Sequence, residues 1–291
     1  MGKSCFYTIL LRCSFLLIGL SVMFSVASAD DEAPGRVWHV CMECAERDFP
    51  SIGDALRQAK PKDTILVYWE PAFPYYMEHL VIDKPVRIIS NAAAADITSY
   101  DYYPVIASVS NEIVHITVPG VELIGFNLIY LQKPADCEDE ALCYAESIGL
   151  RLDAPALIRQ VAITNCSTGI LTAYTKPYLG QASTIQLCRI GLPPDHGLTQ
   201  TGFMQTKNHY GIVLLGCRQE GQYLGVGRDK ISDCQIMRNA QYGLVYTTAN
   251  EPEMLGNLIE LNGKGPFRIV NPKLGENQKL IWFDKLKGSE K

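Results

Sequence analysis

A phrase that recurs along the second half of the chain limits the folds open to this sequence. It consists of an asparagine, a glycine a few residues later and a branched apolar run, and it occurs in Asn165–Leu171, Asn208–Leu214, Asn239–Val245 and Asn262–Val270. Its glycines stand at positions 169, 211, 243 and 265, and we interpret the steps of 42, 32 and 22 residues as two coils, one coil with an insertion, and one coil. A fixed repeat of this length, here ~22 residues, predicts a solenoid.

Segments of the form Ile-x-x-Cys give a second repeat. They are Ile163–Cys166, Ile185–Cys188 and Ile231–Cys234, whose cysteines are 22 and 46 residues apart, close to one and two coils. We expect them to stack as a column inside the solenoid, with Ile212 and Leu244 of the first repeat also buried. Asparagine tolerates left-handed backbone and bonds locally, so we expect asparagines at the bends and in a ladder from coil to coil.

A short helix is predicted before the repeats, over residues 51–59. Ser51 stands at the N-cap position, and Ile52, Ala55, Leu56 and Ala59 fall on one helical face. A proline two residues later ends the helix, and a strand is expected from Thr64 to Trp69. Such a helix can cover the open end of a stack of strands.

The remaining chain predicts strands, and length and strand count alone would also fit a β-sandwich. The repeat favours a solenoid over residues 49–270, with residues 271–291 as a tail in which Leu280–Phe283 cover the last coil. The segments FPSIGDALRQAKPKDTILV, HLVIDKPVRIIS, VPGVELIGFNLIY and CQIMRNAQYGLVY resemble pectin-lyase-like β-helix proteins with carbohydrate-binding and sugar-hydrolase repeats. The resemblance covers nearly all of residues 49–270. It implies an all-β, single-stranded right-handed parallel β-helix, a fold that hosts lyases, hydrolases, epimerases, copper-maturation proteins and non-catalytic binders.

The first 29 residues have the parts of a signal peptide. Lys3 and Arg12 form a basic start, Ile9–Val26 is almost wholly apolar, and Ala27–Ala29 is an A-x-A cleavage sequence. The alternative, a transmembrane anchor, needs ~20 apolar residues, and the uninterrupted run after Arg12 is shorter. We therefore predict a secreted or periplasmic protein, with no membrane span after residue 29. Removal of the two basic residues changes the net charge from −5 to −7, which argues against nucleic-acid binding.

Eight of the ten cysteines follow residue 29, and an even number in an exported chain favours disulfides. Cys137 and Cys143 flank an acidic loop and form a good local pair. Cys41 and Cys44 form a CxxC in the segment 30–48. The other four, which lie in apolar strands and are expected to be buried free thiols, are Cys166, Cys188, Cys217 and Cys234.

The CxxC segment also offers a metal hypothesis. His39, Cys41, Met42 and Cys44 are soft or borderline ligands that suit copper or zinc, and the resemblance to copper-maturation β-helices adds to it. The alternative is a Cys41–Cys44 disulfide. Calcium would be expected as a cofactor if the protein were a polysaccharide lyase.

The signatures of known polysaccharide-cleaving β-helices are absent as sets, so candidate catalytic residues come from polar groups in the later coils. They are Asp195, His196, Lys207, His209, Arg218 and Arg238. A histidine beside a carboxylate can act as a base, whereas the alternative is surface charge on the turns. For His115, within a strand, we expect a structural role.

Several tyrosines follow strands, where their rings could stack on sugars or simply pack. They are Tyr174, Tyr178, Tyr210, Tyr242 and Tyr246. The hypotheses are a binding or surface protein for carbohydrate, with an acidic polysaccharide as the expected partner; a lyase or C5-epimerase acting on uronate polymers; and a copper-handling accessory protein. Whether the chain is an enzyme stays open.

Overall fold

The structure, a computed structural model, describes residues 35–70, 75–131, 147–191, 207–219, 222–224 and 227–270. The expected signal peptide, the Cys137–Cys143 pair, Asp195, His196 and the C-terminal tail lie outside the described residues. Among the helices within the described ranges, none is long and apolar enough to cross a bilayer.

Short parallel strands follow one another around successive coils and stack into three sheets. Sheet 1 contains β1 (Val37–Val40), β2 (Thr64–Val67), β5 (Arg87–Ser90), the first halves of β8 (Val121–Tyr130) and β10 (Ala156–Thr164), β12 (Thr184–Gln186), β16 (Lys230–Ser232) and β19 (Glu253–Leu255). Sheet 2 contains β3 (Tyr75–Met77), β6 (Val105–Ser108), the second halves of β8 and β10, β13 (Arg189–Gly191), β17 (Gln235–Met237) and β20 (Leu258–Glu260). Sheet 3 contains β4 (Leu80–Ile82), β7 (Glu112–Ile116), β9 (Ile148–Leu152), β11 (Thr168–Tyr174), β14 (Tyr210–Gln219), β18 (Tyr242–Thr247) and β21 (Gly265–Val270).

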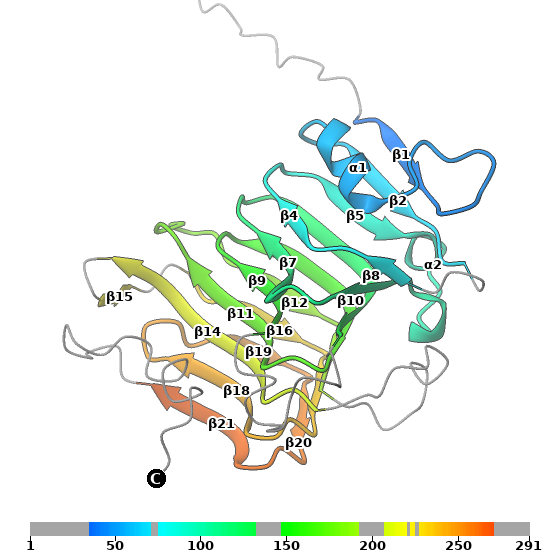
Figure 1. Ribbon diagram of the computed structural model, residues 1–291. Helices are drawn as coiled ribbons and strands as arrows, with labels where there is room; N and C mark the ends of the chain where they lie inside the picture. Colours follow the sequence, from blue (N-terminus) through cyan, green and yellow to red (C-terminus); the bar gives the residue numbers. More distant parts are fainter. Residues whose placement is uncertain are drawn as a thin grey trace, which may run out of the picture. The chain divides into compact units, whose positions relative to one another are not determined.

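This arrangement confirms the predicted parallel β-helix, and Figure 1 shows the strands of sheet 3 side by side from β4 to β21. β8 and β10 each bend from sheet 1 into sheet 2 at a residue with positive φ, Gly125 (φ 78°) and Gln160 (φ 55°). Hydrogen bonds therefore join sheets 1 and 2 into one 13-stranded sheet. The short strand β15 (Gln222–Leu224) pairs with the end of β14 and runs antiparallel to it.

The predicted capping helix is confirmed as α1 (Ile52–Gln58), which lies beside β1 and β2 at the first coil (Figure 1). Ser51 caps it, because its hydroxyl accepts a hydrogen bond from the backbone N–H of Asp54 at 3.1 Å. Its apolar face is buried against the first coils. At the other end, the Lys84 ammonium donates to the carbonyls of Leu56, Arg57 and Ala59 at 2.9 to 3.1 Å and so satisfies the last turn.

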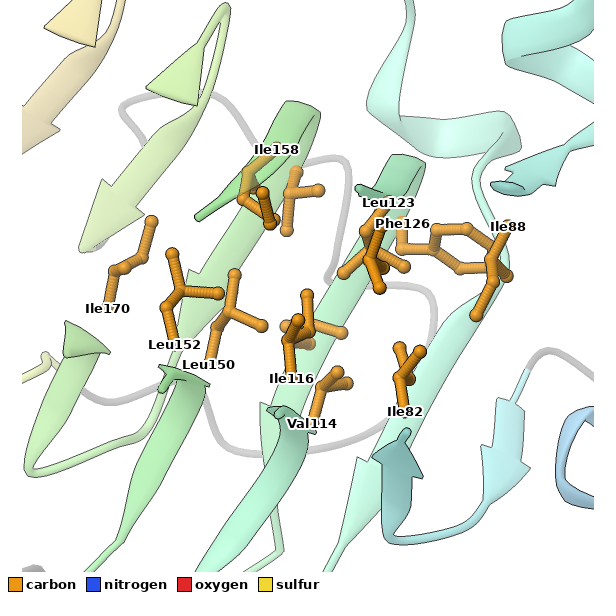
Figure 2. Close-up of a cluster of buried hydrophobic side chains, with 14 of the residues drawn as sticks. Ile82, Ile88, Val114, Ile116, Leu123, Phe126, Leu150, Leu152, Ile158 and Ile170 are labelled. Carbon is orange, nitrogen blue, oxygen red and sulfur yellow. The ribbon is translucent and has the colours of Figure 1, made fainter. Parts of the chain in front are cut away.

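The core is a set of apolar columns that run from coil to coil. One column, in register across sheet 1, consists of Ile65, Ile88, Leu123, Ile158, Ile185 and Ile231, all fully buried. Side chains from sheet 3 meet it inside the coils, and Figure 2 shows Val114, Ile116, Leu150 and Leu152 directed toward Leu123 and Ile158. The predicted core positions Ile212 and Leu244 are partners on β14 and β18, and both are fully buried.

A smaller apolar cluster lies outside the coils. The helix α2 (Asn91–Ala94) follows β5, and the 3-10 helix η1 (Tyr100–Tyr102) comes before β6. Ala92 and Ala93 of α2 and the nearby Tyr103 pack against Ile89 and Ile124. This segment therefore covers part of the outer face of sheets 1 and 2.

The coil count predicted from the repeat is wrong in two steps. β11 pairs directly with β14, so the step of 42 residues between Gly169 and Gly211 is one coil with an insertion. β13 likewise pairs with β17, so the 46 residues between Cys188 and Cys234 are also one coil. The steps of 32 and 22 residues are one coil each, as expected. Extra residues between strands lengthen a coil without adding a strand to the stack, which the spacing alone cannot distinguish from a second coil.

The predicted column of three cysteines is also wrong in part. Ile163 pairs with Ile190 and not with Ile185, so Cys166 lies one bend further along the coil than Cys188. Cys188 and Cys234 do stack, and the backbone N–H of Cys188 donates to the Cys234 sulfur at 3.4 Å.

The asparagines form the expected ladder but mostly do not occupy the left-handed positions. Asn165 has φ 64°, whereas in later coils the residue before the asparagine is left-handed, Arg238 (φ 54°) before Asn239 and Leu261 (φ 57°) before Asn262. The asparagines of the later coils, Asn208, Asn239 and Asn262, instead bond the preceding coil. The Asn262 amide accepts from the Asn239 backbone at 2.9 Å and donates to the Ile236 carbonyl at 3.0 Å. The side chains of Asn239 and Asn262 also bond to each other at 2.8 Å.

The same ladder explains the glycine in the repeat. A Cβ placed on Gly169 would lie 2.6 Å from the Gly211 carbonyl oxygen and 3.1 Å from the Asn208 amide nitrogen. Asparagine and glycine therefore recur together because the side chain of one coil fills the space beside the glycine of the coil before it.

Candidate functional site

The outer face of sheet 3 carries a row of residues that are aligned by strand pairing and alternate with the buried core residues. The members of this row, in order from β7 to β21, are His115, Arg151, Leu171, Val213, Val245 and Arg268. Leu171, Val213 and Val245 form an apolar cluster separate from the interior core. The row is therefore polar on β7 and β9 and apolar from β11 to β18.

Four polar side chains meet at the β7 and β9 part of this face, and we call them the β7–β9 cluster. Arg151 bridges two carboxylates: its Nη1 lies 2.8 Å from Glu112 Oε1 and its Nε lies 2.8 Å from Asp153 Oδ1. His115 lies between the same two acids, with Nε2 2.9 Å from Asp153 Oδ2 and Nδ1 3.2 Å from Glu112 Oε2. The side chains of Asp153 and Arg151 are 9% and 34% exposed, so the cluster is recessed but reaches the surface.

The electrostatics of the β7–β9 cluster hold Asp153 and Arg151 in their charged forms. Burial alone would raise the pKa of Asp153, but hydrogen bonds from His115 and Arg151 outweigh it and lower that pKa. Burial opposes the charge of Arg151, while the bonds to Glu112 and Asp153 raise its pKa. Asp153 and Arg151 are therefore ionised at neutral pH.

His115 contacts both carboxylates of the cluster, one through each ring nitrogen. A neutral imidazole has one N–H and can donate to one of the two carboxylates, whereas the protonated ring donates to both. An imidazole beside carboxylates is an arrangement used for proton transfer. The carboxylates and the planar guanidinium are also the groups that bind hydroxyls in directed pairs. The arrangement can therefore recognise a polyol and can move a proton.

Of the predicted catalytic residues, the three whose side chains the structure describes lie outside this cluster. Lys207, which is exposed, and His209, which is half-buried, come just before β14, and the half-buried Arg238 lies at the equivalent turn before β18. The start of β14 is two strand spacings from β9, or about 10 Å. Arg218 belongs to β14, and its side chain, like Asp195 and His196, lies outside the described residues. Catalytic roles for this set stay a prediction.

Two of the five predicted sugar-stacking tyrosines are buried inside the coils, so that prediction is wrong for them. Tyr174 is 1% exposed and its hydroxyl bonds to Ser183 and the buried Asp229; Tyr178, 8% exposed, packs edge-on against it. Tyr246 also packs against the interior core. Strand pairing and not position after a strand decides which face a ring occupies.

The other two tyrosines lie on the outer face of sheet 3. Tyr210 and Tyr242 are partly buried and pack against the apolar cluster of Leu171, Val213 and Val245. The Arg268 guanidinium lies 5.6 Å from the centre of the Tyr242 ring. Tyr210 belongs to a second outer row, in which Glu112, Ile148 and Thr168 are its partners across the sheet. One end of that row is thus the β7–β9 cluster and the other is aromatic.

The N-terminal cysteines form the predicted disulfide, Cys41–Cys44. Glu70 joins them: the ligand atoms of these three residues lie within 4.8 Å of one another. His39 is not in the group, because its Nδ1 lies 3.0 Å from the Tyr68 hydroxyl and the two rings stack. Copper and zinc require thiolates from cysteine, and a disulfide supplies none. The residues in this oxidised state therefore do not fit the predicted copper or zinc site.

The other four described cysteines are buried free thiols, as predicted. They are Cys166, Cys188, Cys217 and Cys234. Burial raises the pKa of the Cys166 and Cys188 thiols, and Cys188 stacks directly against Cys234 in the next coil. These thiols act as apolar filling in the coils.

A second surface feature is a hollow of about 460 Å³ over sheet 1. Its lining includes Glu122, Leu157, Thr184 and Lys230, which are aligned across β8, β10, β12 and β16. Glu122 faces Arg87 at 3.3 Å and Lys230 faces Glu253 at 3.9 Å, on neighbouring strands. The charged groups of this hollow are thus single exposed pairs and not a convergent cluster, so it is the weaker candidate.

Glu112, Arg151 and Asp153 were not among the residues predicted from the sequence, and His115 was expected to have a structural role. The signal that could have found them is a pair of strands, EIVHI and IGLRL, whose outward positions are charged. Their alignment follows only from the pairing of β7 with β9, which places His115 opposite Arg151.

Comparison with known proteins gives only distant structural likenesses. No family model and no curated protein sequence matches the chain. Among solved structures, a pectin methylesterase from Aspergillus niger is 11% identical over 84% of this chain and 88% of its own, with a TM-score of 0.40. Pectin methylesterase PemA from Erwinia chrysanthemi gives 9% identity, 83% and 91% coverage and a TM-score of 0.38. A pectin methylesterase in complex with a hexasaccharide is 8% identical over 83% of this chain and 92% of its own, with a TM-score of 0.42. Likenesses at this level carry no argument about the site.

Proposed function

We propose that this chain is a carbohydrate-binding β-helix protein and that it binds saccharide on the outer face of sheet 3. The observation that carries the proposal is the β7–β9 cluster, in which two carboxylates, a guanidinium and an imidazole converge on a recessed surface. Sugar hydroxyls donate and accept hydrogen bonds at once, and planar charged groups pair with them in fixed geometry.

The rest of the face suits an extended ligand. Tyr210 lies three strand spacings from Glu112 along one row, about 14 Å. Aromatic rings stack on the apolar faces of sugar rings, and their hydroxyls stay hydrated. A saccharide chain laid across the strands would meet polar groups over β7 and β9 and aromatic surface over β14 and β18.

The charge of the β7–β9 cluster bears on the kind of saccharide. Its two carboxylates outnumber the single guanidinium of Arg151, so the cluster adds no excess positive charge for a polyanion. The expectation of an acidic polysaccharide therefore rests on the cations of the later coils, Lys207, Arg218 and Arg238. The test below compares the binding of acidic and neutral oligosaccharides.

A second candidate is a uronate lyase or epimerase, and one observation favours it: His115 and Arg151 are direct partners on neighbouring strands. Removal of the proton beside a uronate carboxylate needs a base and a cation that neutralises the carboxylate. Arg151 already bonds two acids, so the substrate would have to displace one of them. Calcium does not fit here, because both carboxylates that would bind it are paired with Arg151.

The binding test compares the purified protein with two variants. Arg151→Gln removes the bridging guanidinium of the cluster, and Lys230→Gln removes an exposed cation from the hollow over sheet 1. Isothermal titration with oligosaccharides of alginate, polygalacturonate, xylan and β-glucan should give binding that Arg151→Gln weakens at least about tenfold, the equivalent of one charge-assisted hydrogen bond. Lys230→Gln should bind like the natural protein.

His115→Gln serves as a second cluster variant, since it removes the imidazole without leaving an unpaired charge. The proposal fails if none of the polymers binds, or if Lys230→Gln weakens binding and both cluster variants do not. Absorbance of unsaturated uronate and sugar analysis of the same mixtures separate the two candidates: product that disappears in His115→Gln establishes the lyase or epimerase in place of a binding protein.

A further inference from the structure

The CxxC disulfide differs in its surroundings from a bond that fastens two parts of a fold. Cys41 and Cys44 are three residues apart in one loop, so the bond closes a small ring and removes little entropy from the unfolded chain. Cys41 is 1% exposed, while Cys44 is more exposed. One sulfur is therefore open to a partner and the other is protected.

The buried sulfur has polar partners that suit a free thiol. The backbone N–H of Cys44 points at the Cys41 sulfur at 2.9 Å, which stabilises a thiolate. Glu70 Oε1 lies 2.7 Å from the same sulfur and is held there by the backbone N–H of Met42, also at 2.7 Å. A disulfide sulfur has no hydrogen to donate, so the contact with Glu70 becomes a hydrogen bond only when Cys41 is a thiol.

We propose that Cys41 and Cys44 form a redox-active pair that undergoes thiol–disulfide exchange, with Glu70 as the base for Cys41. This inference is independent of the saccharide site. In the reduced protein, the Cys44 thiolate attacks a partner disulfide, forms a mixed disulfide and releases one partner thiol. Glu70 then takes the proton of Cys41, whose sulfur attacks Cys44 and releases the second partner thiol. The protein dithiol is oxidised, and the partner disulfide is reduced to two thiols.

The reverse reaction passes a disulfide from the protein to a partner dithiol through the same species. The partner is a small-molecule or protein thiol–disulfide couple with access to the Cys44 sulfur. The four buried thiols of the coils take no part, because they are shielded by the core.

The test follows the oxidation of the reduced full chain by glutathione disulfide, with acid quenching, maleimide labelling and mass spectrometry of the peptide around Cys41. Glu70→Gln is the test variant, and Glu43→Gln, an exposed acid inside the same loop, is the matched control. We expect ring closure to slow by about 100-fold in Glu70→Gln, at the low end of general base catalysis, and its mixed disulfide at Cys44 to accumulate. Glu43→Gln should close at the natural rate.

A measurement on the natural protein decides the case even if Glu70→Gln does not fold. At short times the mixed disulfide should be on Cys44, the far-ultraviolet circular dichroism of the reduced chain should be unchanged, and the buried thiols should stay unlabelled. The proposal is overturned if glutathione is found on Cys41, if Glu70→Gln closes as fast as Glu43→Gln, or if reduction exposes the buried thiols.

Discussion

The asparagine ladder gives the sharpest quantitative prediction, at Asn208. Its side chain is fully buried, accepts a hydrogen bond from the Cys166 backbone at 2.9 Å and donates one to the Ile163 carbonyl at 2.9 Å. Asn208→Ala removes both bonds and leaves two buried backbone groups without a partner. Because each such group costs about 1 to 3 kcal/mol, the free energy of unfolding should fall by about 2 to 6 kcal/mol.

A matched variant, Asn257→Ala, removes the same pair of bonds from a less buried place. Asn257 accepts from the Cys234 backbone at 2.9 Å and donates to the Ile231 carbonyl at 2.7 Å, but it is half-buried in the last described coil. Water can replace its bonds, so the loss should be smaller, about 1 kcal/mol. Urea unfolding followed by circular dichroism measures both losses. The slope of the free energy of unfolding against urea concentration should stay the same. A loss below about 0.5 kcal/mol for Asn208→Ala, the size of an ordinary surface effect, would show that these two bonds do not stabilise the coils.

Three further predictions test other parts of the structure. Gly169→Ala should unfold at markedly lower urea than the natural protein, because its Cβ would lie 2.6 Å from the Gly211 carbonyl oxygen; an unchanged midpoint would contradict the assigned pairing. Ser51→Ala should lower the free energy of unfolding by about 1 kcal/mol through loss of the α1 cap, and Thr64→Ala gives a comparison outside the helix. Burial raises the pKa of Asp229 in the native state despite its hydrogen bonds, so its contribution to stability is present below pH 3.8 and is lost as the pH rises through the native pKa. Unfolding titrations across this range should show that fall in the natural protein and not in Asp229→Asn; parallel pH profiles would contradict it.

The sequence predicted those parts of the fold that local patterns determine. The helix of residues 51–59 was recognisable from its cap and apolar face, and both are present in α1. The glycine repeat located β11, β14 and β18, because the close approach of neighbouring coils admits no side chain at Gly169, Gly211 and Gly243. It also located β21, where Gly265 has open space around it and a positive φ of 134°. The number of coils was not predictable from the spacing, because an insertion of nearly a coil's length has the same spacing as an additional coil.

The candidate site depends on contacts between strands that no local pattern contains. Glu112 and Asp153 are far apart in the sequence and meet only through the pairing of β7 with β9. Tyr174 was predicted to bind sugar at the surface, but it is the last residue of β11 and points into the core. There its hydroxyl bonds to the buried Asp229. In both cases the strand register decides where the side chain lies, and no local sequence pattern contains that register.

The most direct test of saccharide binding on sheet 3 is the crystal structure of the protein with an oligosaccharide that binds it in solution. We predict sugar hydroxyls within hydrogen-bond distance of Arg151 and of Glu112 or Asp153, with the chain directed across β11 toward Tyr210. A saccharide bound instead in the hollow lined by Glu122 and Lys230, with the β7–β9 cluster unchanged, would contradict saccharide binding on sheet 3.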